Sequence, residues 1–146
     1  MKRLGMDIGT STIKVAVLED QVIKYKNIRK HYGKVLPVLK EMLEEACDPK
    51  ERMAMCVTGS NAQAVLGADD EIPYLGYIPA VAEGVRYQVP EAGSIIEIGS
   101  QGARFITDLE KQAPEFAVNE HCAGGTGSFF EDQMSRLGLK IEDYSS

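Results

Sequence analysis

The sequence predicts an α/β fold in which a mixed β-sheet carries helices on both faces, followed by the beginning of a second lobe. Strand-like and helix-like segments alternate after an N-terminal run of three strands, and such alternation is typical of a mixed sheet. The order strand-strand-strand-helix then starts again at residue 94, which is a repeat of topology rather than of sequence. We expect a complete first lobe at residues 1–90 and an incomplete second lobe at residues 93–146.

The composition narrows the functional classes. Hydrophobic residues make up 44% of the 146 residues, which is enough for a packed core. The net charge of −6 disfavours nucleic acid as the main partner. The apolar runs are too short for a membrane span. Three cysteines without paired spacing favour a reducing, cytoplasmic environment.

The first expected lobe begins with a hairpin. Apolar runs at residues 4–8 and 13–18 flank the turn Gly9–Thr12, which is rich in glycine and hydroxyl groups. Imperfect alternation predicts a third strand over residues 22–28. A helix is predicted over residues 33–47, and its apolar face is formed by Val35, Leu36, Leu39, Leu43 and Ala46.

The rest of the first lobe alternates strand and helix. A buried strand over residues 52–57 is followed by Thr58–Asn61, a brief strand over residues 72–75 and a helix over residues 78–87 that Pro90 closes. The Thr58–Asn61 segment follows a central strand, where ligands lie in open α/β sheets. Two explanations stay open: this segment lines a cleft, or Ser60 and Asn61 cap a short helix that ends at Leu66.

The second expected lobe repeats the first pattern. Strands are predicted over residues 94–98, 103–106 and 112–118, with a turn at residues 99–102. A helix is expected from Ser128 to Leu137, because Ser128 and Glu131 have the spacing of a capping box.

The first hairpin combines residue types that suit a magnesium-bound phosphate. Asp7 lies at a strand end, and a carboxylate there can hold Mg²⁺ through water. Gly9 lets the backbone approach a phosphate closely, and turn N–H and hydroxyl groups can donate to its oxygens. An ordinary polar hairpin is the alternative. The residues expected to bind phosphate are Gly9, Thr10, Ser11, Thr12 and Lys14.

The second hairpin repeats this design with Glu97 in the place of Asp7, followed by Gly99, Ser100 and Gln101. Two carboxylate-glycine hairpins, each opening a strand-strand-strand-helix unit, would face each other across a cleft and clamp a polyphosphate. We therefore expect Asp7 and Glu97 to be the catalytic pair that handles Mg²⁺ and the attacking water, and Gly99, Ser100 and Gln101 to bind phosphate.

The third motif surrounds Cys122, which three glycines and a helix start follow closely. The positive end of a helix dipole favours a thiolate, the form of cysteine that binds metal. Iron–sulfur clusters normally need four such thiolates, and this stretch supplies one. A tight glycine loop with an inert cysteine is the alternative.

Residues 7–14, 94–99 and 122–129 carry these three motifs in order, and together they resemble the BadF/BadG/BcrA/BcrD-type ATPase family. That family contains the activators of 2-hydroxyacyl-CoA dehydratases and the ATPase subunits of benzoyl-CoA reductases. The resemblance covers essentially the whole chain. It implies the actin-like ATPase fold, which is ribonuclease-H-like in each lobe.

The resemblance also implies a function. Such activators are homodimers that share one [4Fe-4S] cluster, to which each subunit gives two cysteines; Cys122 matches the first of them. Binding and hydrolysis of MgATP drive a low-potential electron from the cluster into a CoA-ester dehydratase or reductase partner. A ferredoxin or flavodoxin-type protein would supply that electron.

Three positions depart from the family pattern. No cysteine follows Cys122, so we expect the chain to be an N-terminal fragment. Glu97 stands where the family usually has aspartate, and Gly102 stands where it often has an acid. Two other functions remain open: a cluster-free sugar or acid kinase of the same superfamily, and a non-catalytic nucleotide-sensing module.

Overall fold

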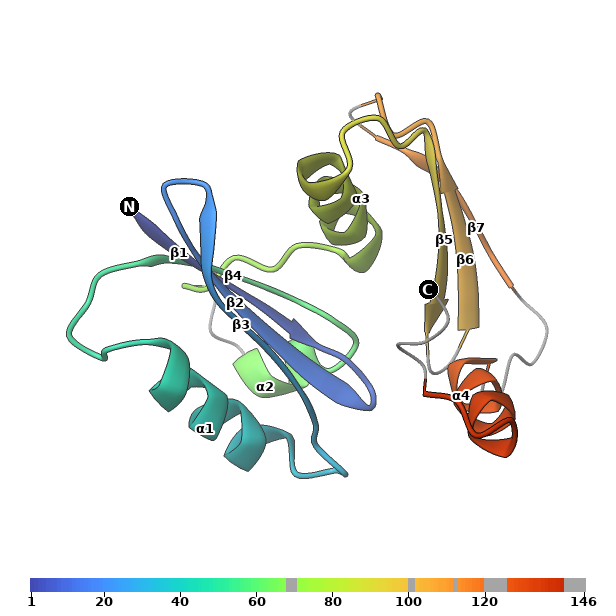
Figure 1. Cartoon of the computed structure of the whole chain (residues 1–146). Coiled ribbons are helices and arrows are strands. Elements are labelled where there is room, and N and C mark those ends of the chain that lie inside the picture. Colours follow the sequence, from blue (N-terminus) through green and yellow to red (C-terminus); the bar gives the residue numbers. More distant parts are fainter. Residues whose placement is uncertain (68–70, 100–101, 112, 120–125, 141–146) are drawn as a thin grey trace. The chain divides into compact units, whose positions relative to one another are not determined.

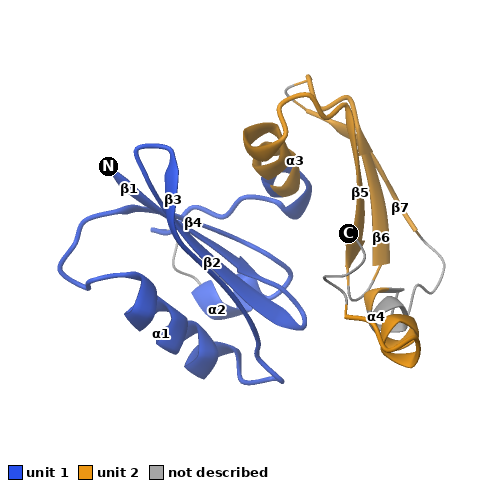
Figure 2. Ribbon diagram, in the orientation of Figure 1, with its two compact units in different colours: residues 1–80 blue, residues 81–146 orange. Residues whose placement is uncertain are grey.

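The computed structural model describes residues 1–67, 71–99, 102–111, 113–119 and 126–140 (Figure 1). The chain divides into two compact units, Met1–Ala80 and Val81–Ser146 (Figure 2). Among the described residues, no helix has both the length and the apolarity that crossing a membrane requires.

Unit 1 is built on a four-stranded mixed sheet, as predicted. The strands are β1 (Lys2–Ile8), β2 (Thr12–Glu19), β3 (Val22–Lys30) and β4 (Ala54–Thr58), in the order β3-β2-β1-β4. The first three strands are antiparallel neighbours, whereas β1 and β4 are parallel. The strand predicted over residues 72–75 is reduced to a single parallel bridge between Val57 and Tyr74.

Two helices cover one face of this sheet. Helix α1 (Val35–Ala46) and helix α2 (Ala62–Leu66) both contribute side chains to the core cluster. Every second residue of β1 and β2 points into that cluster, as the period of a strand requires. The buried strand residues are Leu4, Met6, Ile8, Ile13, Val15, Val17 and Val57.

The helix prediction for α1 is confirmed, but the predicted apolar face was partly wrong. Leu36 is 62% exposed, whereas Met42 is completely buried. Leu39 and Met42 are spaced three apart and lie on the same side of the helix. The sheet therefore packs against the Leu39–Met42 side, and Leu36 lies toward the edge of this contact.

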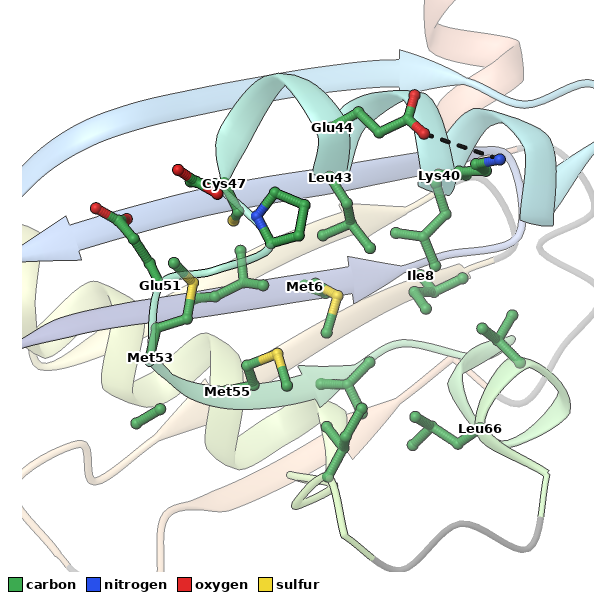
Figure 3. A pocket seen from close by; sticks show the side chains of 18 of the residues that line it. Met6, Ile8, Lys40, Leu43, Glu44, Cys47, Glu51, Met53, Met55 and Leu66 are labelled. Atoms are coloured by element: carbon green, nitrogen blue, oxygen red, sulfur yellow. Dashed lines mark ion pairs between the residues drawn. The ribbon is translucent and has the colours of Figure 1, made fainter.

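An apolar groove runs beside the core, between α1, β4 and α2 (Figure 3). Met6 of β1 and Met55 of β4 lie along this groove, together with Met53 and Leu66. At its rim, Lys40 and Glu44 of α1 form an ion pair with a separation of 3.8 Å. The groove belongs wholly to unit 1.

Unit 2 holds a three-stranded antiparallel sheet. Its strands β5 (Ser94–Gly99), β6 (Gly102–Thr107) and β7 (Glu115–Val118) lie in chain order. Helix α3 (Tyr77–Gln88) leads into this unit, and Arg86 on it donates hydrogen bonds to the carbonyl oxygens of Leu109 and Lys111. Ile106 and Leu109 are buried.

Helix α4 (Thr126–Arg136) is the last helix in the described part of the chain. It confirms the predicted helix but begins two residues earlier. Ser128 therefore lies within the first turn of α4. The side chains of Ser128 and Glu131, on which the predicted capping box depends, lie outside the described part of the structure.

Candidate phosphate site and the comparison with known proteins

The β1–β2 turn is the centre of the candidate site in unit 1. Asp7 is the penultimate residue of β1, and Gly9 donates its backbone N–H to the carbonyl of Thr12 over 3.0 Å. A Cβ at Gly9 would lie 3.1 Å from the same oxygen, which leaves little room for a side chain. The turn thus has a tight backbone path with Thr10 and Ser11 at its tip.

Asp7 makes one ion pair and keeps one oxygen for a further partner. Its Oδ2 accepts a hydrogen bond from Lys14 Nζ over 2.7 Å, and the two residues are directly opposite across the hairpin. Its Oδ1 is buried without a hydrogen-bond partner, as is the hydroxyl of Thr58, the residue paired with Asp7 on β4. A buried polar atom without a partner is costly, so these two oxygens suit a bound water or a hydrated cation.

The segment after β4 lies directly against this turn. Gly59 has φ +103°, and a Cβ there would be 2.5 Å from the carbonyl atoms of Ile8. Only glycine fits this approach. Beyond it, Asn61 N–H donates to Ile8 O over 2.9 Å, and the hydroxyls of Ser60 and Thr10 lie 3.0 Å apart.

The Asn61 side chain tests one of the two explanations for this segment, the helix cap. It precedes α2, but its side chain makes no capping hydrogen bond to the helix. The Asn61 Nδ2 instead donates to Gly9 O over 2.9 Å. The side-chain cap was therefore a wrong explanation, because the amide bonds across to the turn, 52 residues away in sequence.

His31 contacts the same turn, and no motif in the sequence pointed to it. The residue is only 5% exposed. Its Nε2 lies 3.2 Å from Gly9 O, and its backbone N–H donates to Ser11 O over 3.2 Å. A histidine just beyond a strand end gives no periodic signal in the sequence. The contacts of His31 with the turn depend on the pairing of β3 with β2, which brings His31 beside Gly9 and Ser11.

The second hairpin has the same internal arrangement. Glu97 and Arg104 are directly opposite across β5 and β6, and Arg104 donates to Glu97 Oε2 over 2.6 Å. A Cβ at Gly99 would lie 2.9 Å from Glu97 Oε1, so the glycine lies close to the carboxylate. Ser100 and Gln101, the other predicted phosphate-binding residues, lie outside the described residues.

Cys122, the predicted metal ligand, also lies outside the described residues. The described cysteines, Cys47 and Cys56, are free and partly buried. Burial raises the pKa of the Cys47 thiol, and the nearby negative charge of Glu51 adds to this effect. Within the described ranges, no group of three or more histidine, cysteine, aspartate or glutamate side chains is arranged to hold a metal.

The predicted residues of unit 1 therefore come together at one end of its sheet, namely Asp7, Gly9, Thr10, Ser11, Thr12 and Lys14. Those of unit 2 that the structure describes, Glu97 and Gly99, do so at the end of β5.

Known proteins resemble the chain over nearly its whole length. The activator of lactoyl-CoA dehydratase from Anaerotignum propionicum is 31% identical over 98% of the chain, which covers 56% of that protein. The solved structure of the Acidaminococcus fermentans (R)-2-hydroxyglutaryl-CoA dehydratase component A is 27% identical in sequence and has a TM-score of 0.76. The match covers 98% of the present chain and 56% of the Acidaminococcus chain.

A second solved structure supports the fold alone. The activator of 2-hydroxyisocaproyl-CoA dehydratase from Clostridium difficile, crystallised with ADPNP, is 23% identical with a TM-score of 0.73; 97% of this chain matches 54% of that one. The chain thus spans about half the length of the curated relatives it matches.

These similarities agree with the fold of both units. The mixed sheet with its helices is that of an actin-like ATPase, as expected from the two glycine hairpins. The model of one family, BadF/BadG/BcrA/BcrD ATPase, matches residues 4–146. The chain belongs to the BadF/BadG/BcrA/BcrD ATPase family.

Proposed function

We propose that the protein is an ATP-dependent activase whose ATP hydrolysis drives a low-potential electron from a [4Fe-4S] cluster into a 2-hydroxyacyl-CoA dehydratase or a benzoyl-CoA reductase-type partner. One observation carries the ATPase part of this proposal. Asp7 pairs with Lys14, and Glu97 pairs with Arg104, at the same register of two glycine hairpins. Residues 1–90 would be the first ribonuclease-H-like lobe, and residues 93–146 the start of the second.

The β1–β2 turn would bind phosphate. Turn N–H groups and the hydroxyls of Thr10, Ser11 and Thr12 donate hydrogen bonds, and Lys14 adds a positive charge. Asp7 Oδ1 is buried without a partner, so it is available to accept from water on Mg²⁺. When bound, Mg²⁺ would neutralise charge on the phosphate oxygens.

The β5–β6 turn would bind phosphate from the second lobe through Gly99, Ser100 and Gln101. Glu97 would orient the attacking water, for which a carboxylate one methylene longer than aspartate is chemically adequate. Arg104, held 2.6 Å from Glu97 Oε2, fixes the carboxylate in place. Holding the water and the phosphate in a fixed geometry is the main catalytic task in phosphoryl transfer.

Cys122 would supply one thiolate to the cluster, which a homodimer would share. A helix N-terminus suits such an anionic centre, and α4 begins four residues after Cys122. The partner would be a CoA-ester dehydratase or reductase, and the donor a ferredoxin or flavodoxin-type protein in an anaerobic cytoplasm. The relatives named above are activators of such dehydratases.

The ATPase part is tested with isosteric substitutions in the full-length gene product. Asp7→Asn and Glu97→Gln keep side-chain size but remove the charge. We expect each to lower kcat for ATP hydrolysis by about 10²-fold or more, because loss of one catalytic electrostatic contact costs that much. Asp48→Asn, an exposed carboxamide substitution in the α1–β4 connection, is the matched control and should leave kcat unchanged. Wild-type kcat in both site variants would contradict the proposal.

The cluster part has its own measurement. Iron and acid-labile sulfide are determined after anaerobic purification of the full-length gene product. About four irons per dimer should be found, and Cys122→Ala should lose them. Cys47→Ala should retain them, because Cys47 directly follows α1 and packs against the core cluster of unit 1. A folded, reconstituted wild type without iron would leave a kinase or a nucleotide sensor of the same fold.

A further inference from the structure

We propose that His31, together with Asn61, is a positioning residue that orients the peptide groups of the β1–β2 turn toward the phosphates of the nucleotide. This inference rests on the proposed ATP site and adds two residues from β4–α2 and β3–α1 to it. Both side chains act through the turn backbone and not through a ligand.

The carbonyl oxygens of the β1–β2 turn are held by hydrogen bonds from outside the turn. Gly9 O accepts from Asn61 Nδ2 over 2.9 Å and lies 3.2 Å from His31 Nε2. Ser11 O accepts the backbone N–H of His31 over 3.2 Å. The carbonyl oxygens on both sides of Thr10 are therefore held toward the protein.

The directions of the turn N–H groups follow from peptide geometry. The C=O and N–H groups of a trans peptide point in opposite directions, and the described residues contain no cis peptide. A fixed Gly9 carbonyl thus turns the N–H of Thr10 away from His31 and Asn61. A fixed Ser11 carbonyl does the same for the N–H of Thr12. The N–H of Thr10 then faces away from the two side chains that hold the turn, where an anion can accept from it.

The contacts of the His31 ring fix its protonation. Gly33 N–H donates to His31 Nδ1 over 3.1 Å, so Nδ1 carries a lone pair and no proton. Nε2 must then carry the proton of the neutral ring and donate it to Gly9 O. Both ring nitrogens are used, and a doubly protonated ring would set two N–H groups against each other at Gly33. Only the neutral Nε2–H tautomer fits both contacts.

Two substitutions separate the ring nitrogens. His31→Asn keeps an acceptor near the Nδ1 position and loses the donor to Gly9 O. His31→Gln reaches the Nε2 position with an amide donor. If His31 orients the turn, His31→Asn should weaken binding of a non-hydrolysable ATP analogue about tenfold, whereas His31→Gln should stay within about threefold, since one hydrogen bond is at stake.

Adenosine serves as the ligand control because it has no phosphate. Affinities of adenosine and of the analogue are measured calorimetrically on the full-length gene product, and adenosine binding should not change in either variant. Equal losses for both ligands, or equal losses in both variants, would mean that His31 only supports packing, and would overturn the inference. Asn61→Asp, which replaces the second donor by a carboxylate, should also weaken the analogue selectively; unchanged affinity there counts equally against it.

A nucleotide-free measurement keeps this inference separate from the ATP site itself. Long-range ¹H–¹⁵N spectra report the imidazole tautomer, and the Nε2–H form is expected in wild type. The amide resonances of Thr10 and Thr12 should shift in His31→Asn and stay near wild type in His31→Gln. A different tautomer or unmoved amides would refute the orienting role. A wild type that binds no nucleotide but shows these spectra would instead refute the proposed ATP site.

Discussion

The two glycine hairpins have the same local geometry in different surroundings. Each places a carboxylate and a cation seven residues apart in sequence and opposite each other in space. In the β1–β2 hairpin, the residues flanking the carboxylate, Met6 and Ile8, are 6% and 1% exposed. The corresponding Ile96 and Ile98 of the β5–β6 hairpin are 73% and 52% exposed.

This difference teaches that strand pairing and face burial have separate causes. Register comes from the hairpin itself, because a tight turn fixes which residues are opposite. Burial comes from what packs on the sheet, and in unit 1 that is α1 and α2. Matched substitutions in the two hairpins can therefore measure how much a covering helix contributes.

The largest expected effect concerns equivalent isoleucines. Ile8→Ala should lower the free energy of unfolding of unit 1 by about 4 kcal/mol, because it leaves a cavity under the helices. Ile98→Ala removes the same atoms from a half-exposed site and should cost unit 2 less than about 1 kcal/mol. Native-state hydrogen exchange of β1 and β5 amides reports both values. Similar costs in the two hairpins would show that the covering helices contribute little.

A second expected effect tests the close approach of Gly59 to the backbone of Ile8. Among the described residues, only the β1–β2 hairpin has such a contact. Gly59→Ala should destabilise unit 1 by about 3 kcal/mol, because the residue has φ +103° and its Cβ would meet the backbone of Ile8. Gly67→Ala is the control: Gly67 also has positive φ, but no atom of the described residues lies within 4 Å of its Cβ, and about 1 kcal/mol is expected. Urea denaturation measures both. Equal losses would mean that the close approach at Ile8 is relaxed at no cost.

The smallest expected effect concerns a surface link between β3 and α1. Arg29 Nη2 donates a hydrogen bond to Glu45 Oε1 over 2.6 Å, and this contact, together with a hydrogen bond from Tyr25, holds the pKa of Glu45 below its usual 4.5. A lowered folded-state pKa stabilises the fold above the unfolded pKa, and this contribution is lost as pH falls through the folded value.

Glu45→Gln should accordingly be less stable than wild type at pH 7, and the difference should shrink below about pH 4.5. Urea denaturation at several pH values between 7 and 3 measures it. Glu44→Gln removes another exposed carboxylate from α1 and should give a profile close to wild type. A Glu45→Gln difference that stays constant down to pH 3 would contradict the role of the Arg29 contact.

Local sequence patterns predicted most elements because their causes are local. The hairpins follow from apolar runs that flank glycine and hydroxyl residues, and α1 follows from its apolar period. The weak points were places where packing decides. Leu36, predicted on the apolar face, is exposed, and Met42, which the predicted face did not include, is buried. The strand predicted over residues 72–75 is a single bridge. Both outcomes depend on neighbours far away in sequence.

The sequence by itself determined the two carboxylate-glycine hairpins and, through the order of three motifs, the ATPase family. The residues of each motif lie within ten positions of one another in the sequence. Only the tertiary structure decided that His31 and Asn61 hold the β1–β2 turn, since the Gly9 carbonyl that both contact is 22 and 52 residues away. Such contacts form between side chains and backbone atoms, and backbone acceptors carry no residue type that a sequence pattern could reveal.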